Sequence, residues 1–169
     1  MDMSISTEVP GDERGTLLAF VESQRAALRK AAQGLSEEQA AGRHSASELS
    51  LSGLLKHAAQ VERNWLRMAQ QQPYESTPES HLDGFKLAEG ETMPSVLAFW
   101  ESVSAELTRF VEELPSLDET FPLPPAPWFP ENHKVSMRWM LLHLVEEFAR
   151  HAGHADVIRE SLDGTKAMG

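Results

Sequence analysis

Four stretches of the chain place apolar residues at intervals of three and four, which is the period of an amphipathic helix. The stretches span about residues 12–33, 48–70, 93–114 and 135–162, and no stretch alternates convincingly as a β-strand would. The pattern therefore predicts an all-α protein, and four helices of this length favour a four-helix bundle. The third stretch has the clearest apolar face, made by Met93, Val96, Trp100, Val103, Leu107, Phe110 and Leu114.

Two long connections join these helices. The loop 73–91 follows the second helix and is polar, so we expect it either to cover part of the bundle or to move freely. The loop 121–134 follows the third helix, and its prolines forbid a helix there, while its large apolar residues predict packing against the bundle. A short helical turn is predicted at 36–39, which has the spacing of a capping box. Long connections leave the order of the helices open.

Length and composition narrow the class of protein. The 169 residues suit one domain, with a core at about 12–164 and a flexible segment at 1–11. A net charge of −11 argues against nucleic acid and anionic membranes as partners, and no apolar run approaches a transmembrane length. The chain has no cysteine, which excludes disulfides, thiolate metal sites and cysteine nucleophiles. This composition is compatible with a cytoplasmic protein, which is the localisation we expect.

Three polar residues interrupt apolar helix faces. Glu147 and His151 are four residues apart in the fourth helix and therefore lie on one face, and His57 stands on the apolar face of the second helix. A buried carboxylate without a partner costs roughly 1–3 kcal/mol or more, so Glu147 requires compensation. If the two helices are neighbours, the three side chains can hold a divalent metal. Three ligands leave an open coordination position, and nitrogen and oxygen donors suit Zn²⁺, Ni²⁺ or Fe²⁺.

A structural interpretation of the same residues stays open at this stage. A single core histidine is more often hydrogen-bonded than metal-bound, and Glu147 with His151 has the spacing of an ordinary ion pair on a helix. No phosphate-binding loop, Gly-x-Ser-x-Gly or His-Glu-x-x-His motif is present, so a reactive group would have to be bound at the metal.

Three further residues are candidates for a supporting or substrate-binding role beside the metal. His154 lies three residues beyond His151 and is a candidate fourth ligand, supporting group or substrate contact. His143 lies four residues before Glu147, and Glu62 lies about one turn after His57, where it is a candidate hydrogen-bond partner.

Two segments, Leu51–Trp65 and Val135–Glu160, resemble the DinB/YfiT-like family of metalloenzymes, and in particular its mycothiol-transferase-like branch. The resemblance extends from about Thr16 to Gly164. It implies a four-helix bundle in up-down-down-up order, often a homodimer. It also implies a metal triad with one histidine on the second helix and two ligands four residues apart on the fourth. His57, Glu147 and His151 occupy these positions.

The carboxylate in the middle of this set resembles the mycothiol-dependent maleylpyruvate isomerase branch, whose triad is His, Glu, His. The isomerase has an additional C-terminal domain that this sequence lacks, so maleylpyruvate itself is not the expected substrate. The resemblance implies a transferase or isomerase that uses a divalent metal, with Zn or Ni expected before Fe, and a low-molecular-weight thiol such as mycothiol or bacillithiol. The alternatives are a stress-related bundle that binds a metal or small molecule without catalysis, and a metal-free structural bundle.

Overall fold

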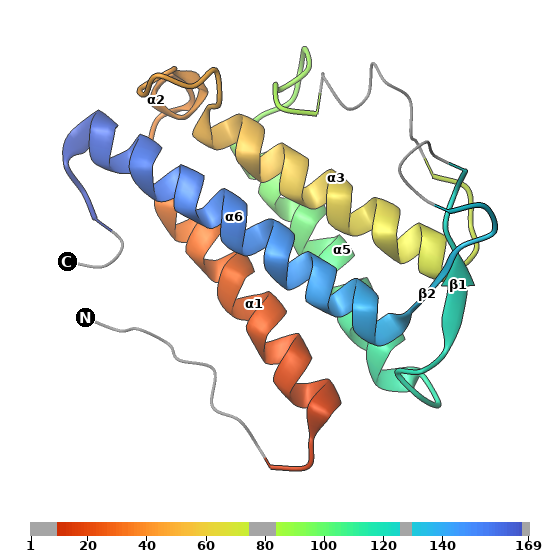
Figure 1. Ribbon diagram of the computed structural model, residues 1–169. Coiled ribbons are helices and arrows are strands. Elements are labelled where there is room, and N and C mark those ends of the chain that lie inside the picture. Colours follow the sequence, from red (N-terminus) through yellow and green to blue (C-terminus); the bar gives the residue numbers. More distant parts are fainter. Residues whose placement is uncertain (1–9, 75–83, 126–129, 167–169) are drawn as a thin grey trace.

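Four long helices packed side by side make up the body of the protein (Figure 1). The computed structural model describes residues 10–74, 84–125 and 130–166. The prediction of an all-α fold is confirmed, and the helix bounds lie within a few residues of those expected. The elements are α1 (Glu13–Ala32), α2 (Glu37–Ala41), α3 (Leu51–Ala69), α5 (Met93–Glu113), β1 (Thr120–Pro122), β2 (Lys134–Ser136) and α6 (Met137–Asp163).

Polar caps set where the helices begin. Each of the five helices in the described part of the chain follows a residue whose side-chain oxygen accepts a hydrogen bond from a backbone N–H of the first turn. These caps explain why the second helix begins at Leu51 rather than at 48, and why the fourth begins at Met137 rather than at 135. The predicted capping box at 36–39 is present and opens α2. The capping residues are Asp12, Ser36, Ser50, Thr92 and Ser136.

Side-chain contacts at both ends show that α1 and α6 run in the same direction. Near the start of both helices, Arg138 forms an ion pair with Glu13. Near their ends, Arg159 donates to the carbonyl oxygens of Ala31 and Gln33, at 2.9 Å in each case.

The helices α3 and α5 are also parallel to each other. Lys56 pairs with Glu91 just before α5, and Arg67 near the end of α3 pairs with Glu106. By contrast, α3 and α6 are antiparallel, because residue 57 contacts residue 147 while residue 65 contacts residue 143. The order is therefore up-down-down-up, as the family resemblance implied, so the end of α3 and the start of α5 lie toward opposite ends of the bundle (Figure 1).

The core of the bundle is apolar and continuous. Trp100 of α5 and Phe148 of α6 are both fully buried, with ring centroids 5.8 Å apart. The expectation that the loop 121–134 packs on the bundle holds for Phe121 and Leu123, which are buried. Residues 126–129 of this loop lie outside the described part of the chain. The same is true of residues 75–83 of the first long loop and of residues 1–9 of the N-terminal segment. Within the described ranges, no helix has both the length and the apolar character needed to cross a membrane.

A small sheet that the hydrophobic pattern did not indicate accompanies the helices. Residues Thr120–Pro122 and Lys134–Ser136 pair as a two-stranded antiparallel sheet, with Phe121 opposite Val135. Strands of three residues are too short for an alternating pattern to be visible in the sequence. The sheet joins the end of α5 to the start of α6, and Val135 therefore belongs to β2 and not to the fourth helix.

Candidate metal centre

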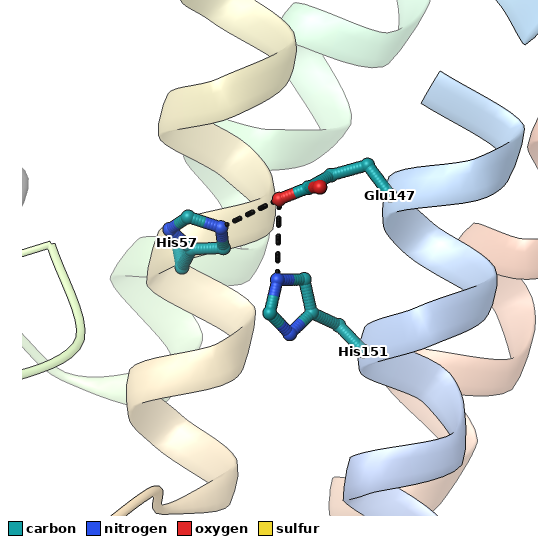
Figure 2. A group of neighbouring side chains, drawn as sticks. All are labelled: His57, Glu147 and His151. Atoms are coloured by element: carbon teal, nitrogen blue, oxygen red, sulfur yellow. Dashed lines mark hydrogen bonds and ion pairs between the residues drawn. The ribbon is translucent and has the colours of Figure 1, made fainter. Parts of the chain in front are cut away.

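His57 on α3 and the pair Glu147 and His151 on α6 point toward one another across the interface of these two helices (Figure 2). One carboxylate oxygen, Glu147 Oε1, lies 2.9 Å from His57 Nε2 and 3.1 Å from His151 Nε2. The two imidazole rings are close to perpendicular, at 74°, with centroids 4.7 Å apart. The spacing of four residues on α6 and the neighbouring position of α3 thus bring the three residues together.

The carboxylate of Glu147 is strongly stabilised in its charged form. Hydrogen bonds from His151 and then from His57 hold the pKa of Glu147 well below its usual value of 4.5, although burial acts in the opposite direction. The compensation that a carboxylate on an apolar helix face requires is therefore supplied by the two imidazoles.

The same three residues suit a divalent metal ion. One donor atom from each residue can be chosen so that all three lie within 4.8 Å of one another. Ligand atoms about 2.0–2.2 Å from a tetrahedral Zn²⁺ lie roughly 3.3 Å from each other. The observed N–O distances of 2.9 and 3.1 Å are slightly shorter than this, so the carboxylate and the two imidazoles would have to move apart by a few tenths of an ångström to hold the ion. Three ligands of this kind leave a coordination position for a small molecule.

A phenylalanine from the first long loop covers His57. The ring of Phe85 stacks on the imidazole of His57, with centroids 4.0 Å apart and an angle of 16°, and it lies 5.9 Å from the ring of His151. Lys56, the neighbour of His57 in α3, anchors this part of the loop, because its buried ammonium donates to the carbonyl oxygen of Lys86 at 2.9 Å and pairs with Glu91 at 2.7 Å.

The absence of a side chain at Gly53 allows this loop to approach α3. A Cβ atom added there would lie 2.0 Å from the carbonyl oxygen of Phe85. Gly53 therefore fixes how closely the loop packs and, through the loop, where the Phe85 ring lies over the site.

The sequence model of the mycothiol-S-transferase family matches residues 16–164, which is nearly the whole chain. The chain belongs to the mycothiol-S-transferase family. This family is DinB-like, so the resemblance stated from the sequence is confirmed. No curated protein shows significant sequence similarity to the chain. Membership in the mycothiol-S-transferase family relates the protein to mycothiol chemistry, and the reacting residues have to be argued from its own structure.

His154 lies directly beside the triad. Its Nδ1 is 3.3 Å from Nδ1 of His151, on the side of that ring that faces away from Glu147. A histidine that binds a metal through Nε2 usually donates its Nδ1 proton to a partner that fixes the ring. The position of His154 thus suits a supporting group better than a fourth ligand.

His143 lies one turn before Glu147 on α6, but it contacts aromatic rings instead of the triad. It stacks on Trp139 at 5.1 Å and meets the edge of Trp65 at 4.7 Å. Burial lowers the pKa of His143 below 6.5, and this effect exceeds the opposing influence of Glu147. Burial therefore favours the neutral form of the His143 imidazole.

Glu62 does not lie at the candidate site. Its fully buried carboxylate accepts hydrogen bonds from Arg25 and from Trp100 Nε1, the latter at 2.7 Å, and so faces α1 and α5. Five residues of an α-helix correspond to a rotation of roughly 500°, which leaves Glu62 about 140° around α3 from His57. Glu62 is therefore not a hydrogen-bond partner near His57, as the sequence had suggested, because it lies on another face of α3.

Two residues of the site were missed by sequence reasoning. Phe85 and Lys56 had no assigned role, since one lies in a polar loop and the other resembles any surface lysine of a helix. The sequence contained one indication: Phe85 is the single phenylalanine of the largely polar loop 73–91.

Proposed function

We propose that this protein is a divalent-metal-dependent enzyme that transfers a low-molecular-weight thiol, such as mycothiol, to an electrophilic small molecule. His57, Glu147 and His151 are proposed to hold the metal, with Zn²⁺ or Ni²⁺ favoured over Fe²⁺. The observation that supports this most directly is the convergence of two imidazoles and one carboxylate from antiparallel helices in a member of the mycothiol-S-transferase family.

The residues of the site have distinct roles in this proposal. The two Nε2 atoms and the Glu147 carboxylate supply two neutral donors and one negative charge, which leaves a net positive charge when a divalent ion is bound. Such an ion would lower the pKa of a thiol at its open position and keep the sulfur as a thiolate. In the transfer, a bond forms between sulfur and the electrophilic carbon. The thiol proton goes to solvent, and in a displacement the leaving group departs with its electron pair.

The surroundings of the triad are suited to shielding this reaction. The side chains of His57, Glu147 and His151 are 16, 17 and 10% exposed, so most of the surrounding water is excluded while each side chain keeps some exposed surface. Phe85 covers one face of His57 and restricts the approach of water from the loop side. Removal of bulk water strengthens the electrostatic interaction between the site and a thiolate.

Thiol consumption by the purified, metal-loaded protein tests the proposal. Mycothiol and a panel of electrophiles are incubated with the wild type, with His151→Ala and with His133→Ala, which alters an exposed histidine outside the triad. We expect His151→Ala to lose turnover and His133→Ala to retain it. Turnover by the wild type no faster than by His151→Ala, across the panel, would contradict the enzymatic proposal. Tight metal binding without turnover would favour the alternative that the protein binds a metal or small molecule without catalysis.

A further inference from the structure

Aromatic side chains continue the α3–α6 interface beyond the triad. Along α6, His143 lies one turn before Glu147, and Trp139 lies one turn before His143. Along α3, Trp65 lies about two turns after His57. Because α3 and α6 are antiparallel, these three side chains meet on the same side of the triad, and we refer to Trp65, Trp139 and His143 as the aromatic cluster.

The geometry of the aromatic cluster combines a fixed base with an open ring. Trp65 packs against the fully buried Phe121, with centroids 6.4 Å apart. His143 lies parallel to Trp139, at 6° and 5.1 Å, and the two indoles are 5.5 Å apart. Trp139 is nevertheless 39% exposed, although a tryptophan that served only to fill the core would be covered. The cluster therefore offers an aromatic surface that is held in place by the packing of Trp65 on Phe121 and is exposed to solvent at Trp139.

His143 adds a polar group to this surface. In its neutral form the imidazole has one N–H donor and one acceptor nitrogen. Among residues 10–74, 84–125 and 130–166, no hydrogen bond to either nitrogen is formed. A half-buried ring that forms no hydrogen bond to the described residues can donate its N–H to a carbonyl or nitro oxygen of a bound molecule.

We propose that the aromatic cluster is the subsite for the electrophile, and that this electrophile is a planar aromatic or conjugated molecule bearing a carbonyl or nitro oxygen. The inference rests on the proposed function, since it places the electrophile beside the thiol. Four residues of helix span about 6 Å, so a ring bound on Trp139 and His143 places its reactive carbon within one or two turns of the triad. Offset stacking between aromatic rings contributes about 0.5–1.5 kcal/mol beyond the area buried, and a saturated molecule gains none of this.

Binding of an unreactive probe to metal-free, thiol-free protein tests the subsite. The probe is 4-nitroacetophenone, which is planar, carries both a carbonyl and a nitro group, and has no thiol to react with in this protein. It is compared with cyclohexyl methyl ketone, which keeps the carbonyl oxygen but has neither the planar ring nor the nitro group. Calorimetric titration is carried out on the wild type, on Trp139→Ala and on Phe99→Ala. Phe99 is a matched control because it is also 39% exposed but lies on α5. We expect Trp139→Ala to raise the Kd of the probe at least tenfold and Phe99→Ala to change it less than twofold.

A second variant keeps the test decisive if Trp139→Ala fails to fold. His143→Phe keeps an aromatic ring at this position but removes the hydrogen bond to the probe. It should therefore weaken the binding of 4-nitroacetophenone relative to that of an aromatic molecule without oxygen, such as naphthalene. Equal binding of the planar and saturated ketones, or no probe binding at all, would overturn the proposal. A change of oligomeric state in Trp139→Ala without any change in probe affinity would overturn it as well, and would assign Trp139 to a protein contact.

The subsite and the proposed function can fail separately. The variant His151→Ala removes a proposed metal ligand but leaves the aromatic cluster intact, so it should bind the probe as the wild type does. Probe binding in a wild type that consumes no thiol would refute the enzymatic proposal and support the subsite. Turnover that is unaffected by Trp139→Ala, with aromatic and alkyl electrophiles alike, would support the enzymatic proposal and refute the subsite.

Discussion

Phe85 lies face to face with His57, with ring centroids 4.0 Å apart and only 16° between the two planes. This contact joins a loop between α3 and α5 to the imidazole that α3 contributes to the candidate metal centre. Because the ring of Phe85 also approaches His151, it restricts the rotation of both imidazoles. The loop is therefore part of the site, and its attachment to α3 has consequences that can be measured.

The variant Phe85→Ala should bind a divalent metal less tightly than the wild type. Without the stacked ring, His57 has more rotamers available, and fixing one of them on metal binding costs more conformational entropy. We expect a loss of roughly tenfold, at the lower end of what supporting residues around a metal contribute. Competition with a chromophoric chelator measures the affinity, and Phe99→Ala serves as the control. Equal affinities for Phe85→Ala and the wild type would show that the stacking does not position His57.

The two helical glycines Gly53 and Gly153 should respond to alanine in opposite ways. Neither has a reason in helix propensity to be glycine, and Gly→Ala within a helix normally stabilises by about 0.5–1 kcal/mol. Around Gly153 no atom lies within 4 Å of an added Cβ, so that variant should show the gain. At Gly53 the Cβ would lie 2.0 Å from the carbonyl oxygen of Phe85, so the loop must move.

Urea denaturation and metal titration distinguish these two outcomes. Gly153→Ala should have a higher free energy of unfolding, whereas Gly53→Ala should lose the gain and bind metal as weakly as Phe85→Ala. A Gly53→Ala variant that is more stable and binds metal normally would show that the loop does not depend on this close approach.

The ion pair between Lys56 and Glu91 should make the loop sensitive to acid. Partial burial alone would raise the pKa of Glu91, but hydrogen bonds from Lys56 and from the backbone N–H of Ala88 outweigh burial and place the pKa below 4.5. A carboxyl group with a lowered pKa in the folded state stabilises the fold above its unfolded pKa, and this contribution is lost as the pH falls through the folded pKa. The ion pair between Lys56 and Glu91 is therefore fully formed at pH 7 and is lost as the pH falls below about 4.5.

Carboxyl NMR titration checks this directly. In Lys56→Met, which keeps the length and apolar stem of the side chain, the pKa of Glu91 should be higher than in the wild type. The difference in the free energy of unfolding between the wild type and Lys56→Met should also shrink as the pH is lowered below 4.5. An unchanged Glu91 pKa in Lys56→Met would show that the ion pair does not stabilise the charged form of Glu91.

The sequence predicted the bundle and the triad because both depend on helix periodicity. A histidine and a glutamate on apolar helix faces are visible as interruptions of a regular pattern, and a spacing of four residues places two side chains on one face. The contact between Phe85 and His57 depends on how a loop returns across the bundle, which no periodicity encodes. The position of Glu62 required the angle around the helix axis, because proximity in sequence to His57 does not place it on the same face.

The buried carboxylate of Glu62 should be important for stability. It is fully buried and pairs with Arg25, which is 2% exposed, so Glu62→Ala leaves this buried guanidinium with the half-exposed Glu22 as its remaining acidic partner among the described residues. Loss of one partner of a buried pair costs about 3–5 kcal/mol. Glu106→Ala breaks the half-exposed pair with Arg67 and should cost less than about 1 kcal/mol.

Denaturant titration gives both values, and a double variant separates charge from packing. Arg25→Met combined with Glu62→Leu removes both charges at similar volume, so it should recover much of the stability lost in Glu62→Ala. If Glu62→Ala and Glu106→Ala are equally stable, the buried network makes no special contribution to the fold.

Anomalous scattering from crystals soaked with Zn²⁺ or Ni²⁺ tests the metal centre most directly. We expect one strong peak about 2.0–2.2 Å from His57 Nε2, His151 Nε2 and an oxygen of Glu147, with at least one further coordination position open to solvent or thiol. A peak elsewhere on the protein, or no peak between these three side chains at full soaking, would contradict it and leave Glu147 as a carboxylate that only orders two histidines.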